Sequence, residues 1–169
     1  MSDETAAQIT GFDHFSPTVS DVEASAAWYQ SVFGMIRLPA VYQHHDREET
    51  GYAVILFEPN SGVVIGLHHH TGGSSGPFDE SRIGLDHIGF TVPDRASLDL
   101  WAEKLDGLGI AHSGVRDITE PSTFSTLVFR DPDNIQLELA FTMPAPGATE
   151  PGVTEPGASE PGASEPGAG

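Results

Sequence analysis

The strongest constraint in this sequence is an internal repeat that covers most of the chain. The segment GFDHFSPTVSDVEASAAWY (11–29) aligns with GLDHIGFTVPDRASLDLWA (84–102) at a constant offset of 73 residues. The aligned segments share identical residues at Gly11 and Gly84, Asp13 and Asp86, His14 and His87, Thr18 and Thr91, Val19 and Val92, Asp21 and Asp94, and Trp28 and Trp101. Repetition at a fixed offset indicates two copies of one structural unit.

The repeat continues further along the chain with a shift of a single residue. AVILFEPNSGVVIGL (53–67) aligns with STLVFRDPDNIQLEL (125–139) at an offset of 72 residues, which places Phe57 on Phe129 and Leu67 on Leu139. One deletion in a loop is enough to explain the change of offset. The sequence therefore predicts that both copies share one order of secondary structure.

Each copy is predicted to fold as one strand, one helix and three further strands, so the fold class is α+β with a paired βαβββ unit. The first helix is expected to begin at a capping box, Ser20-x-x-Glu23, and to end at Gly34. The second is expected to begin at Asp94 and to end at Gly107 or Gly109. The strands are predicted over 9–19, 35–44, 51–58 and 62–70 in the first copy, and over 84–92, 110–118, 123–130 and 134–141 in the second.

These elements define a single domain over 9–143. Module one spans 9–70, a Gly/Ser-rich linker spans 71–83, and module two spans 84–143. Residues 144–169 repeat a Glu-Pro-Gly unit without large apolar side chains, and we expect an acidic, disordered tail there.

The charge and the missing cysteines exclude several functions. The formal net charge is −18, and four of these charges lie in the tail, which leaves −14 for residues 1–143. Binding to nucleic acid or to an anionic membrane needs clustered Lys and Arg, so neither partner is expected. The chain has no cysteine. With neither a signal-peptide pattern at the N-terminus nor an apolar run of about 20 residues, the sequence predicts a soluble cytoplasmic protein.

Without cysteine, histidine and carboxylate are the strong metal ligands left to this chain. His14 and His87 occupy the same position in the two copies, and they are expected to face one cavity if the copies pack about a pseudo-twofold axis. Glu138 lies between Leu137 and Leu139 on the last strand, so its carboxylate faces either solvent or a cation. Two imidazoles and one carboxylate suit a divalent ion such as Fe, Mn, Ni, Co or Zn.

Ordinary structural roles compete with this interpretation. A histidine on a strand is more often a hydrogen-bonded core residue than a ligand, and Glu138 alone is typical of an exposed strand position. Asp13 and Asp86 precede the two histidines. Because adjacent strand residues point to opposite faces, we expect these aspartates to bond elsewhere rather than to support the histidines.

Three segments resemble the vicinal oxygen chelate superfamily, which includes glyoxalase I, extradiol dioxygenases, fosfomycin-resistance enzymes and bleomycin-resistance proteins. They are FDHFSPTVSDVEASAAWYQSVFGM (12–35), LDHIGFTV (85–92) and FRDPDNIQLEL (129–139). The resemblance implies two βαβββ modules that form an open, barrel-like sheet around a metal ion. It also implies ligands on the first strand of each module and on the last strand, which here assigns His14, His87 and Glu138.

The chain departs from the four-ligand glyoxalase pattern at Gly66, which matches Glu138 and cannot ligate. His68 follows two residues later on the same strand face, and His70 two residues after that. His68 or His70 is therefore a metal ligand, an acid/base beside the substrate, or a polar strand end without chemistry. The other polar candidates for the cavity are Tyr42, His44, Tyr52 and Arg116, although 44–49 is predicted first as a solvated loop.

Three functions fit these residues. The preferred one is a glyoxalase-like lyase or isomerase, in which a metal held by His14, His87, Glu138 and His68 chelates two oxygens of a small substrate and Glu138 or His68 moves a proton. An Fe(II) extradiol-type dioxygenase needs only His14, His87 and Glu138. A non-enzymatic binder of the bleomycin-resistance type needs no metal. Open sheet edges and paired modules favour a homodimer.

Overall fold

A computed structural model describes residues 9, 11–45, 47–73 and 76–143 of the chain. The tail predicted over 144–169 lies outside these described residues. The first module comprises β1 (His14–Phe15), α1 (Val22–Phe33), β2 (Ile36–Gln43), a short 3-10 helix η1 (Glu48–Thr50), β3 (Gly51–Phe57) and β4 (Val64–His70). The second comprises β5 (His87–Thr91), α2 (Arg95–Gly107), β6 (Arg116–Ile118), β7 (Phe124–Arg130) and β8 (Gln136–Thr142).

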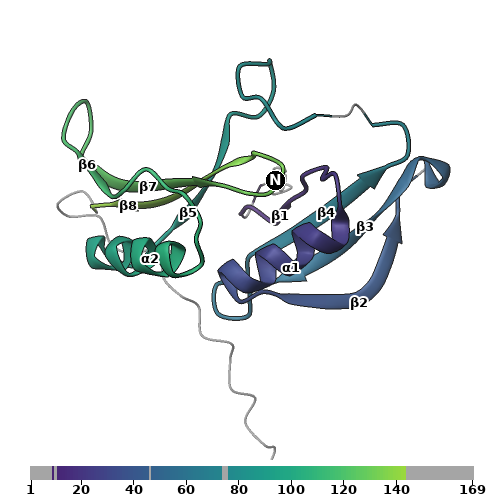
Figure 1. Cartoon of the computed structure of the whole chain (residues 1–169), viewed down its shortest axis with the longest axis horizontal. Helices are drawn as coiled ribbons and strands as arrows, with labels where there is room; N and C mark the ends of the chain where they lie inside the picture. The colour runs from purple at the N-terminus through teal and green to yellow at the C-terminus, as the bar shows by residue number, and fades with distance from the viewer. Residues whose placement is uncertain (1–8, 10, 46, 74–75, 144–169) are drawn as a thin grey trace, which may run out of the picture.

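Both modules form the same open four-stranded sheet. The strand order is β1-β4-β3-β2 in module one and β5-β8-β7-β6 in module two. In each sheet the first strand runs parallel to the last, and the other neighbours are antiparallel. The two sheets and their helices lie side by side (Figure 1). The paired βαβββ fold predicted from the repeat is therefore confirmed.

Strand pairing shows where the two copies differ in length. Phe57 pairs with Val64 in module one, and Arg130 pairs with Gln136 in module two. Phe57 thus corresponds to Arg130, and the sequence alignment of Phe57 with Phe129 is wrong by one residue. The additional residue lies in the turn between β3 and β4, because a turn tolerates an insertion that a paired strand does not.

The first strand is much shorter than the predicted 9–19. The ladder of β1 and β4 pairs His14 with Val64, then breaks, and resumes in the same register at a single bridge between Thr18 and His68. Pro17 lies in the break and has no N–H to donate. Phe90 occupies the matching position of module two, where β5 is continuous.

The start of α1 also differs from the prediction. Its N-cap is Asp21, whose side chain accepts hydrogen bonds from the backbone N–H groups of Glu23 and Ala24. The backbone N–H of Ser20 donates instead to Asp133 of module two, so the predicted capping box at Ser20 is wrong. The cap of α2 at Asp94 and the left-handed Gly34 at the end of α1 are as expected.

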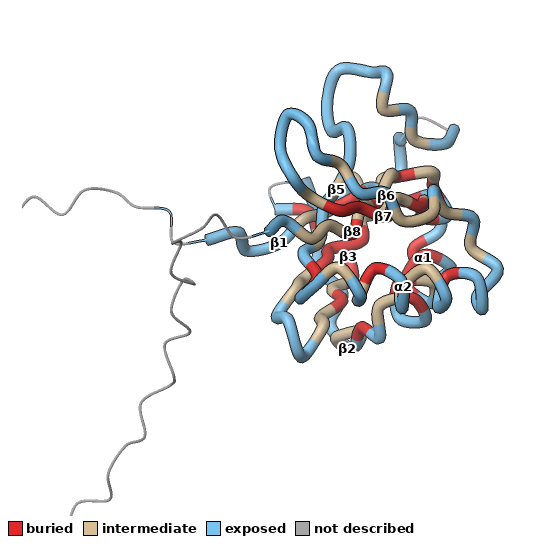
Figure 2. The backbone as a smooth tube through the Cα atoms, turned by 90° about the vertical axis from the view of Figure 1, so that its left-hand side faces the viewer, coloured by how far each residue is buried: buried red, intermediate tan, exposed pale blue. Residues whose placement is uncertain are grey.

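One hydrophobic core joins the two modules. Helix α1 contacts β3 and β4, and α2 contacts β7 and β8. Aromatic rings bridge the modules, with Phe33 of α1 5.1 Å from Phe90 of β5 and 5.6 Å from Trp101 of α2, measured between ring centroids. Figure 2 shows the buried segments gathered where helices and sheets meet, with the loops exposed. Within the described residues no helix is long and apolar enough to cross a membrane.

The turn after β7 connects module two to α1 through buried carboxylates. Asp133 accepts hydrogen bonds from Ser20 N at 2.9 Å and from Ser25 Oγ at 3.3 Å. Asp131 accepts one from the Tyr29 hydroxyl at 3.0 Å. Burial raises the pKa of the Asp131 carboxyl above its usual range, and hydrogen bonds offset part of the cost of burying it.

Replacing Tyr29 with phenylalanine tests this connection. The Tyr29→Phe change removes one donor from a buried carboxylate, so we expect a loss of about 1.5–3 kcal/mol in the free energy of unfolding, measured by urea denaturation. Tyr42 is an exposed tyrosine on β2. The same change there, Tyr42→Phe, is expected to alter stability by less than about 0.5 kcal/mol. Equal effects of the two substitutions would contradict the role assigned to Tyr29.

Candidate functional site

The two repeated histidines are held in the same way in both modules. Asp13 Oδ2 lies 2.6 Å from His14 Nδ1, and Asp86 Oδ1 lies 2.6 Å from His87 Nδ1. The expectation that these aspartates bond elsewhere is wrong, because each precedes the first residue of its strand and is free of the pleat. A carboxylate that accepts the Nδ1 proton orients the ring and leaves the Nε2 lone pair as the ligating edge.

Glu138 completes a pair with His87 on β8 and β5. Its Oε2 lies 3.2 Å from His87 Nε2, and its Oε1 accepts a hydrogen bond of 2.6 Å from Thr126 of β7. Leu137 and Leu139 on either side are buried in the core, so by strand alternation the carboxylate lies on the sheet face away from α2. His87 and Glu138 therefore meet on one face, whereas their role as metal ligands stays a prediction.

Module one has a glycine, Gly66, where module two has the carboxylate, and neighbouring side chains fill the space beside it. A Cβ placed at Gly66 would lie 2.6 Å from Ser16 Oγ and 3.5 Å from His68 Nε2. The His68 ring thus leans back along the strand and covers the position of Gly66. Its location agrees with the expectation that His68 lies beside the vacant ligand position, whereas its role as ligand or acid/base stays a prediction.

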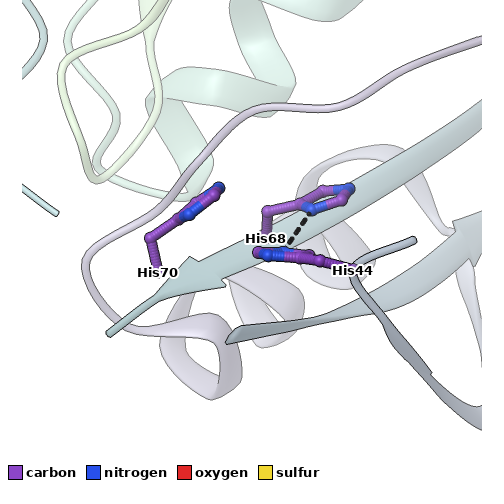
Figure 3. A group of neighbouring side chains, drawn as sticks. All are labelled: His44, His68 and His70. Atoms are coloured by element: carbon purple, nitrogen blue, oxygen red, sulfur yellow. Dashed lines mark hydrogen bonds between the residues drawn. The ribbon is translucent and has the colours of Figure 1, made fainter. Parts of the chain in front are cut away.

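His68 is part of a group of three histidines that the sequence did not predict (Figure 3). His44 Nε2 lies 3.0 Å from His68 Nδ1, and the ring centroid of His70 lies 4.3 Å from that of His44. His44 is only 5% exposed, so its assignment to a solvated loop is wrong. The pairing of β3 with β4 brings His44 to the other two histidines. Gly51 pairs with His70, and a Cβ at Gly51 would lie 3.0 Å from the His44 ring.

The remaining candidates lie apart from these groups. Tyr42 and Arg116 are exposed on β2 and β6. Tyr52 is half-buried, and its ring packs 5.4 Å from that of His69 on the other face of the sheet. Among the described residues, the only group of three or more His, Asp or Glu with ligand atoms all within 4.8 Å of one another is His44, His68 and His70. Within one chain, His14 does not join His87 and Glu138 at that spacing.

Two cavities border both modules. One, of about 530 Å³, has five aromatic residues among its lining, and the other, of about 1100 Å³, lies beside the linker. Neither is lined by His14, His87 or Glu138. The residues that give the smaller cavity its aromatic lining are Phe12, Phe15, Phe33, Phe90 and Trp101.

Burial lowers the pKa of both His44 and His68 below the usual histidine value of 6.5, and the neighbouring imidazoles lower it further. Both rings are therefore neutral at neutral pH. Since protonation is less favourable in the folded state than in the unfolded state, their contribution to stability is present above about pH 6.5 and is lost as the pH falls through the lowered pKa.

The comparisons with known proteins concern the family and the fold. The family model described as "Glyoxalase/Bleomycin resistance protein/Dioxygenase superfamily" matches residues 11–139. A solved glyoxylase/bleomycin resistance protein/dioxygenase domain from Frankia sp. EAN1pec is 33% identical, with 79% of this chain and 92% of that chain covered and a TM-score of 0.67. No curated protein matches the chain in sequence.

More distant structures share the fold. A mutant of the fosfomycin resistance protein FosX from Listeria monocytogenes, complexed with Mn(II) and 1S,2S-dihydroxypropylphosphonic acid, is 19% identical, with 80% of this chain and 95% of that chain covered and a TM-score of 0.56. An integron cassette protein from the mobile metagenome of the Halifax Harbour sewage outfall is 17% identical, covers 78% and 98% of the two chains, and has a TM-score of 0.58.

The pKa of His68 can be followed by NMR in protein stripped of metal. We expect a value below 6.5 in the original chain and a higher value in His44→Ala, because that change removes a neighbouring imidazole and part of the burial. His69→Ala is the matched control, since His69 faces the other side of β4, and it should leave the His68 titration unchanged. An ordinary His68 pKa in the unaltered chain would contradict this description.

Proposed function

The chain belongs to the Glyoxalase/Bleomycin resistance protein/Dioxygenase superfamily, and we propose that it is a divalent-metal-dependent enzyme of the glyoxalase-like type. Its substrate is a small molecule with two neighbouring oxygens, and the reaction is a lyase or isomerase step. His14, His87 and Glu138 hold the ion, and Glu138 or His68 transfers the proton.

One observation carries this proposal. Both copies of the repeat keep an Asp–His pair in which the aspartate is 2.6 Å from Nδ1 of the histidine, and this arrangement is typical of metal-ligating histidines. In module two the free Nε2 edge faces a carboxylate 3.2 Å away. Two imidazoles and a carboxylate fit Fe, Mn, Ni, Co or Zn. When bound, such an ion polarises substrate oxygens and stabilises negative charge on them.

The protein side chains would handle the proton. Glu138 is held by the Thr126 hydroxyl at 2.6 Å, which fixes one oxygen and leaves the other turned toward the site. His68, neutral at pH 7, has its Nε2 edge 3.5 Å from where a Cβ of Gly66 would lie, beside the Ser16 hydroxyl. A neutral imidazole can accept a proton, and a base is most effective when its pKa lies near the working pH.

We propose that the site is completed in a homodimer. His14 does not join His87 and Glu138 within one chain, and a twofold partner can bring its His14 to this pair while receiving the reciprocal contact. Phe12 and Leu85 occupy matching positions just before the two Asp–His pairs and are 82% and 50% exposed. Apolar side chains at equivalent positions beside both half-sites favour a surface that a second copy covers.

The FosX complex with Mn(II) and a vicinal diol supports a divalent ion and a small oxygen-rich ligand. The glyoxalase-like reaction is the function that these donors support best.

Metal content is the first test of this site. We expect His87→Ala and Glu138→Gln to reduce the bound divalent metal of Mn(II)-loaded protein at least about tenfold, measured by elemental analysis after dialysis, and to abolish turnover. His112→Ala is the matched control, because His112 is hydrogen-bonded to Asp106 outside the site. Retention of Mn(II) by both site variants would contradict the proposed metal site.

Mixed dimers test whether the ligands come from two chains. His14→Ala and His87→Ala homodimers are each expected to lack the site. If His14 serves the partner, a dimer of one chain of each kind keeps one intact site and recovers about half of the metal. If all three ligands come from one chain, the mixed dimer recovers none. Separation of differently tagged chains and metal analysis distinguish these results.

Gly66 favours one alternative, an Fe(II) extradiol-type dioxygenase, because a three-ligand site leaves positions for a catecholate and dioxygen. Oxygen uptake on catechols by Fe(II)-loaded protein would select it. The aromatic cavity of about 530 Å³ favours another, a binder of the bleomycin-resistance type. Tight binding of a cationic glycopeptide by metal-free protein would select that function.

A further inference from the structure

The three histidines of module one form a second group of metal-type ligands, separate from His14, His87 and Glu138. His68 and His70 lie on the same face of β4, and His44 follows β2 and turns in between them (Figure 3). The ligand atoms of all three lie within 4.8 Å of one another. The ring centroid of His44 is 5.0 Å from that of His68 and 4.3 Å from that of His70.

Hydrogen bonds fix which nitrogen of His44 is free. The Thr50 hydroxyl donates to the carbonyl oxygen of Arg47 at 2.7 Å, so it accepts from His44 Nδ1 at 2.8 Å. This leaves a lone pair on His44 Nε2, which faces His68 Nδ1 at 3.0 Å. The Thr50 contact is the kind of outer support that orients a metal-ligating imidazole.

The spacing of these two nitrogens matches that of two ligands on one ion. With bonds of about 2.0–2.1 Å, two nitrogens on a tetrahedral zinc ion lie about 3.3 Å apart, slightly more than the 3.0 Å found here. An ion can therefore replace the His68 proton with only a small outward movement of the rings. His44 is buried and held by Thr50, so little side-chain entropy is lost on its side.

We propose that His44, His68 and His70 bind a transition-metal ion such as zinc through three imidazole nitrogens. His68 and His70 are half-buried, and His70 lines the larger cavity beside the linker. One face of the ion is therefore open to a water molecule or a small anionic ligand, as in zinc sites that keep an exchangeable fourth position.

The donor set distinguishes this site from the one proposed above. Imidazoles without a carboxylate suit Zn, Ni and Cu, whereas Mn and Mg prefer oxygen ligands. We therefore expect the three-histidine site to bind zinc and to discriminate strongly against Mn(II). The proposed catalytic centre, with Glu138, accepts either ion. The two sites can be separated by substitution because none of the residues proposed to hold the first ion, His14, His87 and Glu138, belongs to the three-histidine group.

The test uses the full chain with the first site removed, His87→Ala/Glu138→Gln, stripped of metal by a chelator and titrated with zinc in a calorimeter at pH 7.5. We expect one zinc ion per chain. Adding His70→Ala should weaken zinc binding at least about tenfold, and adding His44→Ala should do the same. His69→Ala, the neighbouring histidine on the opposite face, is the matched control and should leave zinc affinity unchanged.

Measurements of folding, thermal stability and Mn(II) competition accompany the zinc titration. Because His44 is buried, its variant could fail to fold, so the half-buried His70 carries the main comparison, and circular dichroism of each variant monitors folding. Zinc should raise the melting temperature of the background protein and not that of the His70→Ala variant. Excess Mn(II) should leave the zinc titration unchanged. Zinc binding of equal strength in the His69→Ala and His70→Ala variants, or efficient competition by Mn(II), would overturn the proposal.

These outcomes are independent of whether His14, His87 and Glu138 hold an ion, and zinc on His68 would leave Glu138 as the group that transfers the proton at that first site. Loss of Mn(II) binding on changing His87 and Glu138 concerns the first site alone. Zinc binding that persists in that background and disappears with His70→Ala supports the second site whether or not the first one exists. A background that binds no zinc at all refutes the three-histidine site and leaves the first proposal intact.

Discussion

Buried carboxylates in a single turn set the relation of the two modules. Asp131 and Asp133, after β7, accept hydrogen bonds from Tyr29, Ser25 and the backbone of Ser20, all at or near α1. A buried carboxylate is costly unless such donors satisfy it, so the turn and the helix have to meet in one arrangement. The same turn leads directly into β8 and Glu138. In module one the residue that corresponds to Asp131 is Glu58, which bonds instead to Asn60 and Ser61 of its own turn. The turn of module two therefore binds the helix of module one, and the turn of module one makes no matching contact through Glu58.

The two copies have distributed their polar side chains differently on equivalent sheet faces. By strand register, Glu138 and Ala140 of β8 correspond to Gly66 and His68 of β4. Module two has Glu138 followed by the small Ala140, and module one has the small Gly66 followed by His68. The two polar groups therefore lie one repeat of the strand apart, about 6.6 Å. Thr126, which holds Glu138 at 2.6 Å, corresponds to Ala53, which pairs with His68. The small residues of module one make room for imidazoles, and the hydroxyl of module two secures a carboxylate.

Much of this arrangement follows from the sequence because a repeat supplies its own comparison. The offset of 73 residues identified the helices and the two histidines, and strand alternation put Glu138 opposite its leucine neighbours. The predictions that were wrong applied a general rule of secondary structure at positions where a specific residue or tertiary contact changes the outcome. Pro17 interrupts a strand predicted to be continuous. Asp13 and Asp86 bond to the adjacent imidazoles because they lie just outside their strands. Ser20 does not cap α1, since its N–H is taken by a carboxylate from the other module.

The sequence by itself determined the fold, because the periodicity of apolar residues and the turn-forming residues repeat in both halves and leave one consistent order of elements. It also determined which residues are candidates for ligands. Only the tertiary structure decided which of them meet. His44 and His70 are 26 positions apart along the chain, and register across β2, β3 and β4 brings their rings within 4.3 Å. His14 and His87 are equivalent in sequence, yet among the described residues His14 forms no group with His87 and Glu138 at ligand spacing, because the distance between equivalent residues depends on how the modules pack.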